Sequence, residues 1–353
     1  MTEQQHEPWA KKLIAWFKTH RRDLPWRTDS PRDPYKVWVS EIMLQQTKVE
    51  AARPYYEHWI EQFPTIKSLA EASQDDVLKA WQGLGYYSRA RNLHEAVQEV
   101  EAHYGGKVPD TKEEIRKLKG VGEYTAGAIL SIAYGKDEVA VDGNVLRVFA
   151  RLYNIKENVL SGPTKKKITK LAEDNLLPHT GAIMCEALMD FGAMICIPKS
   201  PHCDQCPLQD DCQAYAAGTA KELPVRVTKK KVPTEAITVV VIEEKGRWLI
   251  HRRPEKGMLA SMWEFPNVIG KGPQGRQNVA DVLQGLGLTV SVKPKKIGTL
   301  KHIFSHKIWN MTIYEGHVMS GTLRKKEDWQ WLRVSDYATV PWAGPHGKIT
   351  AMV

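Results

Sequence analysis

The sequence predicts a mainly α-helical N-terminal part followed by a smaller α+β domain. From Trp9 to about Ala217, apolar residues recur with the roughly 3.6-residue period of amphipathic helices, with Asp or Pro at predicted helix starts and Gly at helix ends. Near Lys221 the basic, proline-containing stretch KELPVRVTKKKVPTEA lacks any period, which predicts a linker lying on the surface or against an anion. Beyond this stretch, short β-type runs bounded by turn residues take over.

Length and charge narrow the class of protein. A chain of 353 residues can bury two or three separate cores, and a net charge of +9 favours a polyanionic partner, with a solvated basic surface as the alternative. No apolar run approaches the roughly 20 residues of a membrane span, and the start MTEQQHEPWAKKLIAWF lacks the layout of a secretory signal. We therefore expect a soluble, cytoplasmic protein.

Several short helices are predicted in the helical part, too many for a simple four-helix bundle. One begins with Asp33 as N-cap and Pro34 at the first helical position, and continues through an apolar stripe that includes Trp38 and Ile42. Others fall in QDDVLKAWQGLGYYSRARNLHEAVQEV, TKEEIRKLKG and GNVLRVFARLYNI.

The segment LKGVGEYTAGAIL predicts a glycine hairpin between two helices. Gly120 and Gly122 allow the backbone to approach another molecule closely, and a helix is expected from Thr125 onward. Because amide groups at a helix start attract anions, the hairpin is a candidate phosphate-binding loop. A plain helix-loop-helix turn is an equally good interpretation of these residues alone.

The C-terminal third reads as strands with one helix. ITVVVIEEKGRWLIHRR predicts a hairpin around Lys245 and Gly246, SMWEFPNVIG a further strand, NVADVLQGLG a short helix closed by glycine, and NMTIYEGHVM another strand.

Four of the five cysteines lie in CIPKSPHCDQCPLQDDC, with the spacing C-x6-C-x2-C-x5-C. Four thiolates in one short loop can hold a single zinc ion or a four-iron cluster. Zinc ribbons usually have two C-x2-C pairs and this segment has one, so the spacing favours iron-sulfur. The fifth cysteine, Cys185, is most simply a core residue.

Two carboxylates have surroundings suited to acid-base chemistry. Glu41, in VWVSEIML, has apolar neighbours within one helical turn, so burial would raise its pKa and make it a general acid; a glutamate at the rim of an apolar stripe is the alternative. Asp142 directly precedes a helix and is either an ordinary N-cap or a carboxylate that helix amides keep ionised, with Asn144 placed to orient it. An acid paired with an anion is the arrangement used at glycosidic bonds.

Together, these segments resemble the helix-hairpin-helix superfamily of DNA glycosylases, and most closely the MutY family of adenine DNA glycosylases. The resemblance covers nearly the whole chain. It implies an iron-sulfur helical domain at 1–30 and 135–217, a six-helix barrel domain with the hairpin at 31–134, a linker at 218–234 and a Nudix-like domain at 235–353. The cysteine loop resembles the [4Fe-4S] signature shared with endonuclease III, with four ligands: Cys196, Cys203, Cys206 and Cys212.

Tyr124 distinguishes the two related enzyme types. Endonuclease III-like enzymes carry a sugar-attacking lysine at the position that matches Tyr124, and a phenol cannot form the Schiff base through which lysine cleaves the strand. The resemblance therefore implies a monofunctional glycosylase. Glu41, in SEIMLQQT, matches the glutamate that MutY enzymes have and endonuclease III lacks.

The resemblance also assigns roles to individual residues. Glu41 is expected to protonate N7 of a flipped-out adenine, and Asp142 to stabilise the oxocarbenium-like sugar, with Asn144 and Tyr124 holding the site. Trp26, Arg27 and Glu186 match adenine-pocket positions. The hairpin is expected to grip a phosphate through amides and a bound alkali-metal or calcium ion. The expected contacts with the duplex around the opposing base are Gln46, Thr47 and Tyr86.

The C-terminal domain resembles a Nudix fold, through WEFPN and WQWLRVSDY. Its RQNVADVLQGLGL segment has one Asp and no Glu, which predicts binding without pyrophosphate hydrolysis. HIFSH resembles the loop that reads 8-oxoguanine, with Phe304, Ser305 and His306 at its tip. The expected protein is a monomeric base excision repair enzyme that removes adenine opposite 8-oxoguanine or guanine in double-stranded DNA.

Two alternatives stay open. A bifunctional endonuclease III-like glycosylase acting on oxidised pyrimidines would need a lysine at position 124. A zinc-stabilised DNA-binding protein without enzymatic activity would be colourless and indifferent to Glu41→Gln.

Overall fold

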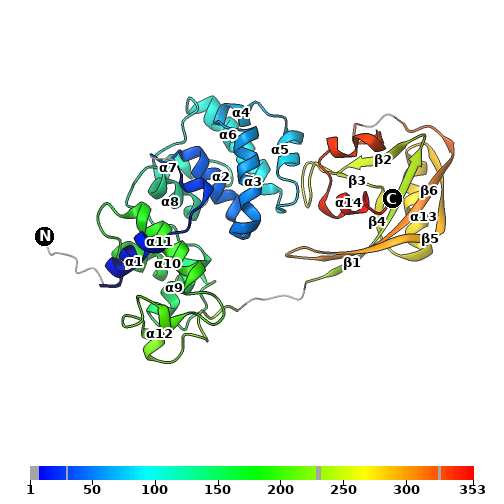
Figure 1. Ribbon diagram of the computed structural model, residues 1–353. Coiled ribbons are helices and arrows are strands. Elements are labelled where there is room, and N and C mark those ends of the chain that lie inside the picture. The colour runs from blue at the N-terminus through cyan, green and yellow to red at the C-terminus, as the bar shows by residue number, and fades with distance from the viewer. Residues whose placement is uncertain (1–7, 29–30, 228–231, 325–326) are drawn as a thin grey trace. The chain divides into compact units, whose positions relative to one another are not determined.

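The computed structural model describes residues 8–28, 31–227, 232–324 and 327–353. They divide into two compact units, one of residues 1–71 and 92–229 and the other of residues 72–91 and 230–353. The described part of the first unit is built from helices, and the strands belong to the second (Figure 1). The four-part division predicted from the sequence is different in detail from these two units and stays a prediction.

The helices begin and end at residues that favour such ends. Asp33 accepts a hydrogen bond from the Tyr35 amide at 2.8 Å, and Pro34 opens the helix, which confirms the N-cap prediction. The helices before the sheet are α1 Pro8–His20, α2 Pro34–Leu44, α3 Val49–Gln62, α4 Ile66–Ala70, α5 Gln74–Ala80, α6 Ser88–His103, α7 Lys112–Ile115, α8 Glu123–Ile132, α9 Gly143–Leu152, α10 Gly162–Asp174, α11 Gly181–Met194 and α12 Gln213–Ala216.

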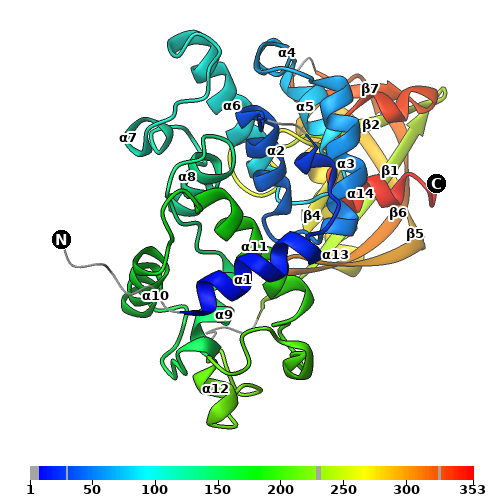
Figure 2. The same cartoon turned by 60° about the vertical axis from the view of Figure 1, so that its left-hand side comes forward.

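One hydrophobic core joins the first helix to much later ones. Trp9 and Leu13 of α1 pack with Phe149 of α9 and Phe191 of α11, and Ile168 of α10 belongs to the same core. Figure 2 shows α1 lying along α11. The N-terminal helix thereby fixes α9, whose first turn carries Asp142 as its N-cap. None of the helices in the described residues is both long and apolar enough to span a membrane.

A seven-stranded sheet forms the second unit, with a central order β3-β2-β1-β6-β5 and with β4 on β1 and β7 on β2. β1 runs parallel to β6, and the other pairings are antiparallel. The strands are β1 Thr234–Glu244, β2 Arg247–Arg252, β3 Trp263–Glu264, β4 Asn267–Ile269, β5 Leu288–Ile303, β6 Ile308–Gly321 and β7 Trp329–Arg333. The unit also contains α13 Gly272–Gly285 and α14 Gly344–Ile349, as well as α5 and the first turn of α6 from residues 72–91.

The strand β1 is buried on both faces. Val239 and Val241 face one core, whereas Val240 and Ile242 face another that α13 closes. Two buried faces explain why this strand is a continuous apolar run rather than an alternating one.

The structure confirms the predicted hairpin at Lys245 and Gly246, which both have positive φ. The single strand predicted for SMWEFPNVIG was wrong, because Phe265 and Pro266 separate two short strands, β3 and β4. The helix predicted in NVADVLQGLG extends back to Gly272.

Candidate active site

Glu41 is a buried carboxylic acid at the end of a helix. It lies in α2 with 4% of its surface exposed, and the Tyr124 hydroxyl donates a hydrogen bond to its Oε2 at 2.5 Å. Burial raises the pKa of Glu41 from 4.5 to about 7, the nearby Asp142 charge adds to the rise, and the Tyr124 hydrogen bond opposes it. A carboxyl group that titrates near neutral pH can donate a proton in a reaction.

Asp142 is the N-cap of α9, and its carboxylate accepts three hydrogen bonds. Its carboxylate accepts from the amides of Asn144 and Val145 at 2.8 and 2.7 Å, and from Asn144 Nδ2 at 2.7 Å. The sequence suggested that helix amides keep Asp142 ionised. In the structure, burial raises the pKa of Asp142, and the hydrogen bonds from the helix amides oppose that rise. Three donors aimed at the oxygens favour the ionised, acceptor-only form.

Arg147 ties the Asp142 region to the cysteine segment. Its guanidinium donates to Asn144 Oδ1 at 2.8 Å, to the Gly192 carbonyl at 2.6 Å and to the Cys196 carbonyl at 2.7 Å. Sequence reasoning missed Arg147. The available signal was a pair of arginines four residues apart inside the apolar stripe VLRVFAR, since buried arginines need designated partners.

A pocket opens beside Glu41 and is lined by Trp26, Arg27 and Glu186 among others. Arg27 is held by ion pairs with Glu186 at 2.9 Å and with the fully buried Asp190 at 2.8 Å. The structure thus brings the three predicted pocket residues together next to the predicted acid. Asp190, which Arg22 also contacts at 2.7 Å, was not predicted.

The glycine hairpin presents backbone amides without side-chain caps. Gly120 has a φ of +80°, and α8 begins at Glu123, two residues before the predicted start. The N-cap residue of α8 is Gly122, which has no side chain that could cap the helix. The first amides of α8 therefore stay available to an anion.

Two predicted duplex contacts have an unusual backbone conformation. Gln46, which is exposed and precedes the half-buried Thr47, has a φ of +59°. Tyr86, in the other unit, has a φ of +48° and 42% of its surface exposed. Non-glycine residues held in the left-handed region are uncommon and concentrate at functional sites.

The predicted recognition loop is the turn between β5 and β6. Ser305 and His306 are exposed, whereas Phe304 is half-buried and stacks edge-on against Trp309 with ring centroids 5.1 Å apart. Phe304 therefore anchors the turn instead of sharing its tip. Ile303, which was not predicted, flanks the turn with 67% of its surface exposed.

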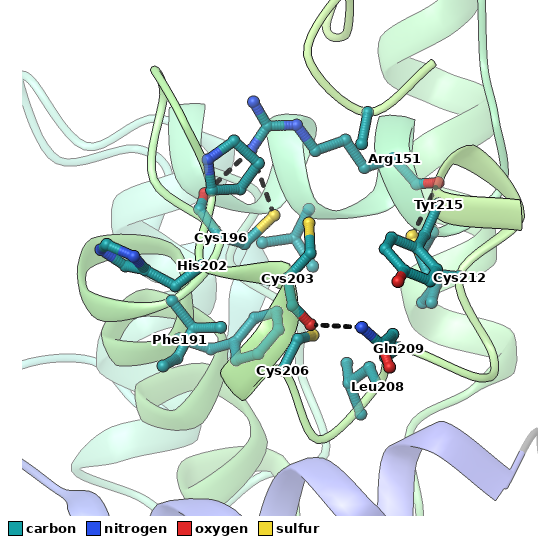
Figure 3. A pocket seen from close by; sticks show the side chains of 15 residues that line it. Arg151, Phe191, Cys196, His202, Cys203, Cys206, Leu208, Gln209, Cys212 and Tyr215 are labelled. Atoms are coloured by element: carbon teal, nitrogen blue, oxygen red, sulfur yellow. Dashed lines mark hydrogen bonds between the residues drawn. The ribbon is translucent and has the colours of Figure 1, made fainter. Parts of the chain in front are cut away.

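The four clustered cysteines line one pocket, together with Arg151 (Figure 3). Across the described residues, no three His, Cys, Asp or Glu side chains are grouped closely enough for one metal ion. Arg151 donates to the Cys196 sulfur at 3.4 Å and to the Ile197 carbonyl at 2.7 Å. Four thiols and an arginine around one pocket can hold an anionic iron-sulfur cluster that takes four thiolate ligands.

Three family models match the chain. Residues 39–178 match the HhH-GPD superfamily of base excision DNA repair proteins, residues 196–212 the iron-sulfur binding domain of endonuclease III, and residues 237–352 the NUDIX domain.

Curated relatives are similar over most of the chain. An adenine DNA glycosylase of Buchnera aphidicola (Schizaphis graminum strain) is 35% identical over 298 residues, which cover 84% of this chain and 84% of the relative. The chain belongs to the adenine DNA glycosylase family. Family members from Arabidopsis thaliana and Homo sapiens are 35% and 34% identical, and the chain spans 54% and 64% of their respective lengths.

Solved structures agree with the helical fold expected of an adenine DNA glycosylase. A thermostable thymine-DNA glycosylase is similar with a TM-score of 0.54 and 29% identity, covering 59% of this chain and 95% of that one. Endonuclease III in a non-covalent complex with DNA has the same fold, with a TM-score of 0.52 and 24% identity over 63% of this chain and all of that one.

The iron-sulfur match falls on the cysteine pocket of this adenine DNA glycosylase family member. It supports a [4Fe-4S] cluster held by the ligand set Cys196, Cys203, Cys206 and Cys212. Burial raises the pKa of the Cys206 thiol to about 12. Because thiolates are the ligands, cluster binding displaces such protons.

Proposed function

We propose that this protein is a monofunctional, monomeric glycosylase that hydrolyses the N-glycosidic bond of adenine opposite 8-oxoguanine or guanine in duplex DNA. The observation that carries the proposal is the pair Glu41 and Asp142: a buried acid with a pKa near 7 beside a pocket, and a carboxylate surrounded by donors. Tyr124 stands at the position where strand-cleaving enzymes carry the sugar-attacking lysine, and it is hydrogen-bonded to Glu41. This supports hydrolysis without a lyase step.

The reaction follows from these two groups. Glu41 donates its proton to the flipped-out adenine, so the base departs as a neutral molecule. The sugar carbon gains positive charge as the bond breaks, and the Asp142 carboxylate stabilises that charge. Water then attacks the same carbon and loses a proton that restores the acid, leaving free adenine and an abasic site in an intact strand.

DNA recognition is assigned to both units in the proposal. The amides at Gly120 and Gly122 hold a phosphate. Carbonyls of the same loop would hold an alkali-metal or calcium ion, which would add positive charge beside that phosphate. Gln46, Thr47 and Tyr86 contact the bases around the expelled adenine. The exposed Ser305 and His306 offer hydrogen bonds to the N7-H and O8 of 8-oxoguanine.

Single-turnover release of adenine tests the proposal. Three duplexes are compared that differ only in the base facing adenine: 8-oxoguanine, guanine or thymine. We expect fast release opposite 8-oxoguanine, slower release opposite guanine and none opposite thymine, with strands intact until alkali is added. Asp142→Asn should abolish release while DNA binding survives. Release by Asp142→Asn at the wild-type rate, or strand cleavage before alkali, would contradict the mechanism.

A further inference from the structure

The first residues of the basic linker lie against the helical unit. Arg151 Nε donates to the Leu223 carbonyl at 3.0 Å, and the Val159 amide donates to the Val225 carbonyl at 3.0 Å. The Val227 amide donates to the Asn158 side chain at 3.3 Å. These hydrogen bonds on either side of Arg226 set the position of its backbone.

Arg226 lies at the first turn of α9, next to the catalytic carboxylate. Its guanidinium donates to the carbonyl of Gly143, the residue after Asp142, at 3.3 Å. A β-carbon built on Gly143 would lie 3.7 Å from the same nitrogen. The side chain is exposed, and among the described residues no carboxylate forms an ion pair with it.

The Gly143 contact does not explain the arginine. That carbonyl is inside α9 and also accepts from Arg147 NH1 at 3.4 Å, so it is no orphan acceptor that needs a partner. Nor does Arg226 neutralise Asp142, whose oxygens accept from Asn144 and Val145. Most of the five guanidinium N–H donors therefore stay open toward solvent beside the reaction centre.

We propose that Arg226 binds a phosphodiester that flanks the excised nucleotide, an inference that rests on the proposed function. When the sugar of the target nucleotide lies at Asp142, the phosphodiesters that join this sugar to the neighbouring nucleotides lie directly beside it. A guanidinium presents a planar fork of donors that matches two phosphate oxygens. The basic linker thereby takes part in positioning the nucleotide for excision.

The salt dependence of binding tests this assignment. Wild-type protein, Arg226→Ala and Arg226→Lys are titrated at several salt concentrations with a duplex that carries a stable abasic-site analogue opposite 8-oxoguanine. The plot of log K against log salt has a negative slope, and loss of one phosphate contact should make this slope less steep by about 0.9. Binding at low salt should weaken roughly tenfold. Arg226→Lys keeps the charge and should keep the slope while losing part of the affinity.

Lys170→Ala serves as the matched control, since Lys170 is an exposed cation on α10 that Asp174 already neutralises. Its slope should equal that of the wild type. An unchanged slope and affinity in Arg226→Ala would overturn the assignment, as would a loss confined to thermal stability, which would show an anchor for the linker only. Because binding is read without catalysis, failure here is distinct from absence of adenine release by the wild type.

Discussion

Glu41 owes its raised pKa to its position in the fold, because an ordinary glutamic acid titrates near 4.5. Its apolar sequence neighbours foretold burial, and the structure confirms it. The partners that tune the pKa, Tyr124 and Asp142, come from helices about 80 and 100 residues further along, which no local pattern reveals. The same holds for the Arg27–Asp190 pair, which a sequence shows as two unrelated charges.

Glu41→Gln should abolish excision and stabilise the fold at alkaline pH. Loss of a general acid lowers the rate on the order of 10²- to 10⁴-fold. The folded-state pKa of Glu41 is raised, so the protein loses stability as pH rises from 4.5 through about 7. At pH 8 the Glu41→Gln variant should therefore have a free energy of unfolding about 1–3 kcal/mol higher than that of the wild type. Denaturant melts of both proteins at pH 5 and pH 8 check this; equal differences at the two values would contradict it.

Tyr124→Phe should shift the pH profile of excision upward. The reaction needs protonated Glu41, so the single-turnover rate should fall as pH rises through about 7. The Tyr124 hydrogen bond lowers the pKa of Glu41, and its removal raises that pKa further. The descending limb should then move to higher pH. A limb that stays in place or moves to lower pH would show that Tyr124 does not tune the acid.

At the scale of elements, close contacts between helices set the position of the Asp142 turn. A β-carbon on Gly192 of α11 would lie 2.7 Å from Cβ of Asn144, and one on Gly127 of α8 would collide with the Val139 carbonyl. Both glycines have ordinary helical surroundings in the sequence, so their importance depends on a tertiary contact. The sequence also failed to predict β5. This strand lies at the edge of the sheet beside solvent, and its lysines obscure the apolar alternation.

Gly192→Ala should reduce excision by about tenfold to a hundredfold, because it displaces Asn144 and with it the carboxylate. Overpacking should also lower the free energy of unfolding by about 1–3 kcal/mol. Gly162→Ala, at a helix start with no atom within 4 Å of the new β-carbon, is the control and should change stability by less than about 1 kcal/mol. Single-turnover rates and thermal melts compare the two variants; equal rates would remove the role given to the Gly192 contact.

Removal of the iron-sulfur cluster should inactivate the protein, because α9 would lose the support of the cysteine segment. Arg147 and Arg151 both donate to carbonyls of the cysteine segment, and Arg147 also holds Asn144. Without the cluster, the segment loses four covalent anchors, and we expect hydrogen exchange of the Cys196–Cys212 backbone to rise. Adenine release should fall in proportion to the iron content measured by absorbance. Full activity in iron-free protein would refute this coupling.

At the scale of the whole molecule, excision and lesion reading are assigned to different units. Glu41 and Asp142 belong to the helical unit, and Ser305 and His306 to the sheet unit. The composition shift near Lys221 predicted this separation, because helix and strand periods differ. It did not predict that residues 72–91 group with the sheet unit, since that depends on contacts between segments far apart in sequence.

A Ser305→Ala, His306→Ala double variant should lose lesion preference and keep excision. The two side chains are exposed and lie 3.4 Å apart, in hydrogen-bond contact with each other, so the fold should be unaffected. Loss of about one hydrogen bond to the lesion corresponds to roughly tenfold in relative rate. The ratio of single-turnover rates opposite 8-oxoguanine and guanine measures it. A ratio equal to that of the wild type would exclude this turn as the reader.

The bridge from the Cys196 carbonyl through Arg147 to Asn144 links the Asp142 turn to the cysteine segment, so we expect the carboxylate's placement to depend on an inorganic assembly that the gene does not encode. A cell short of iron or sulfide would then contain full-length chains whose Asp142 is misaligned. With the proposed function, adenine removal in such a cell would follow iron supply and cluster-loading capacity, even at a constant level of the polypeptide.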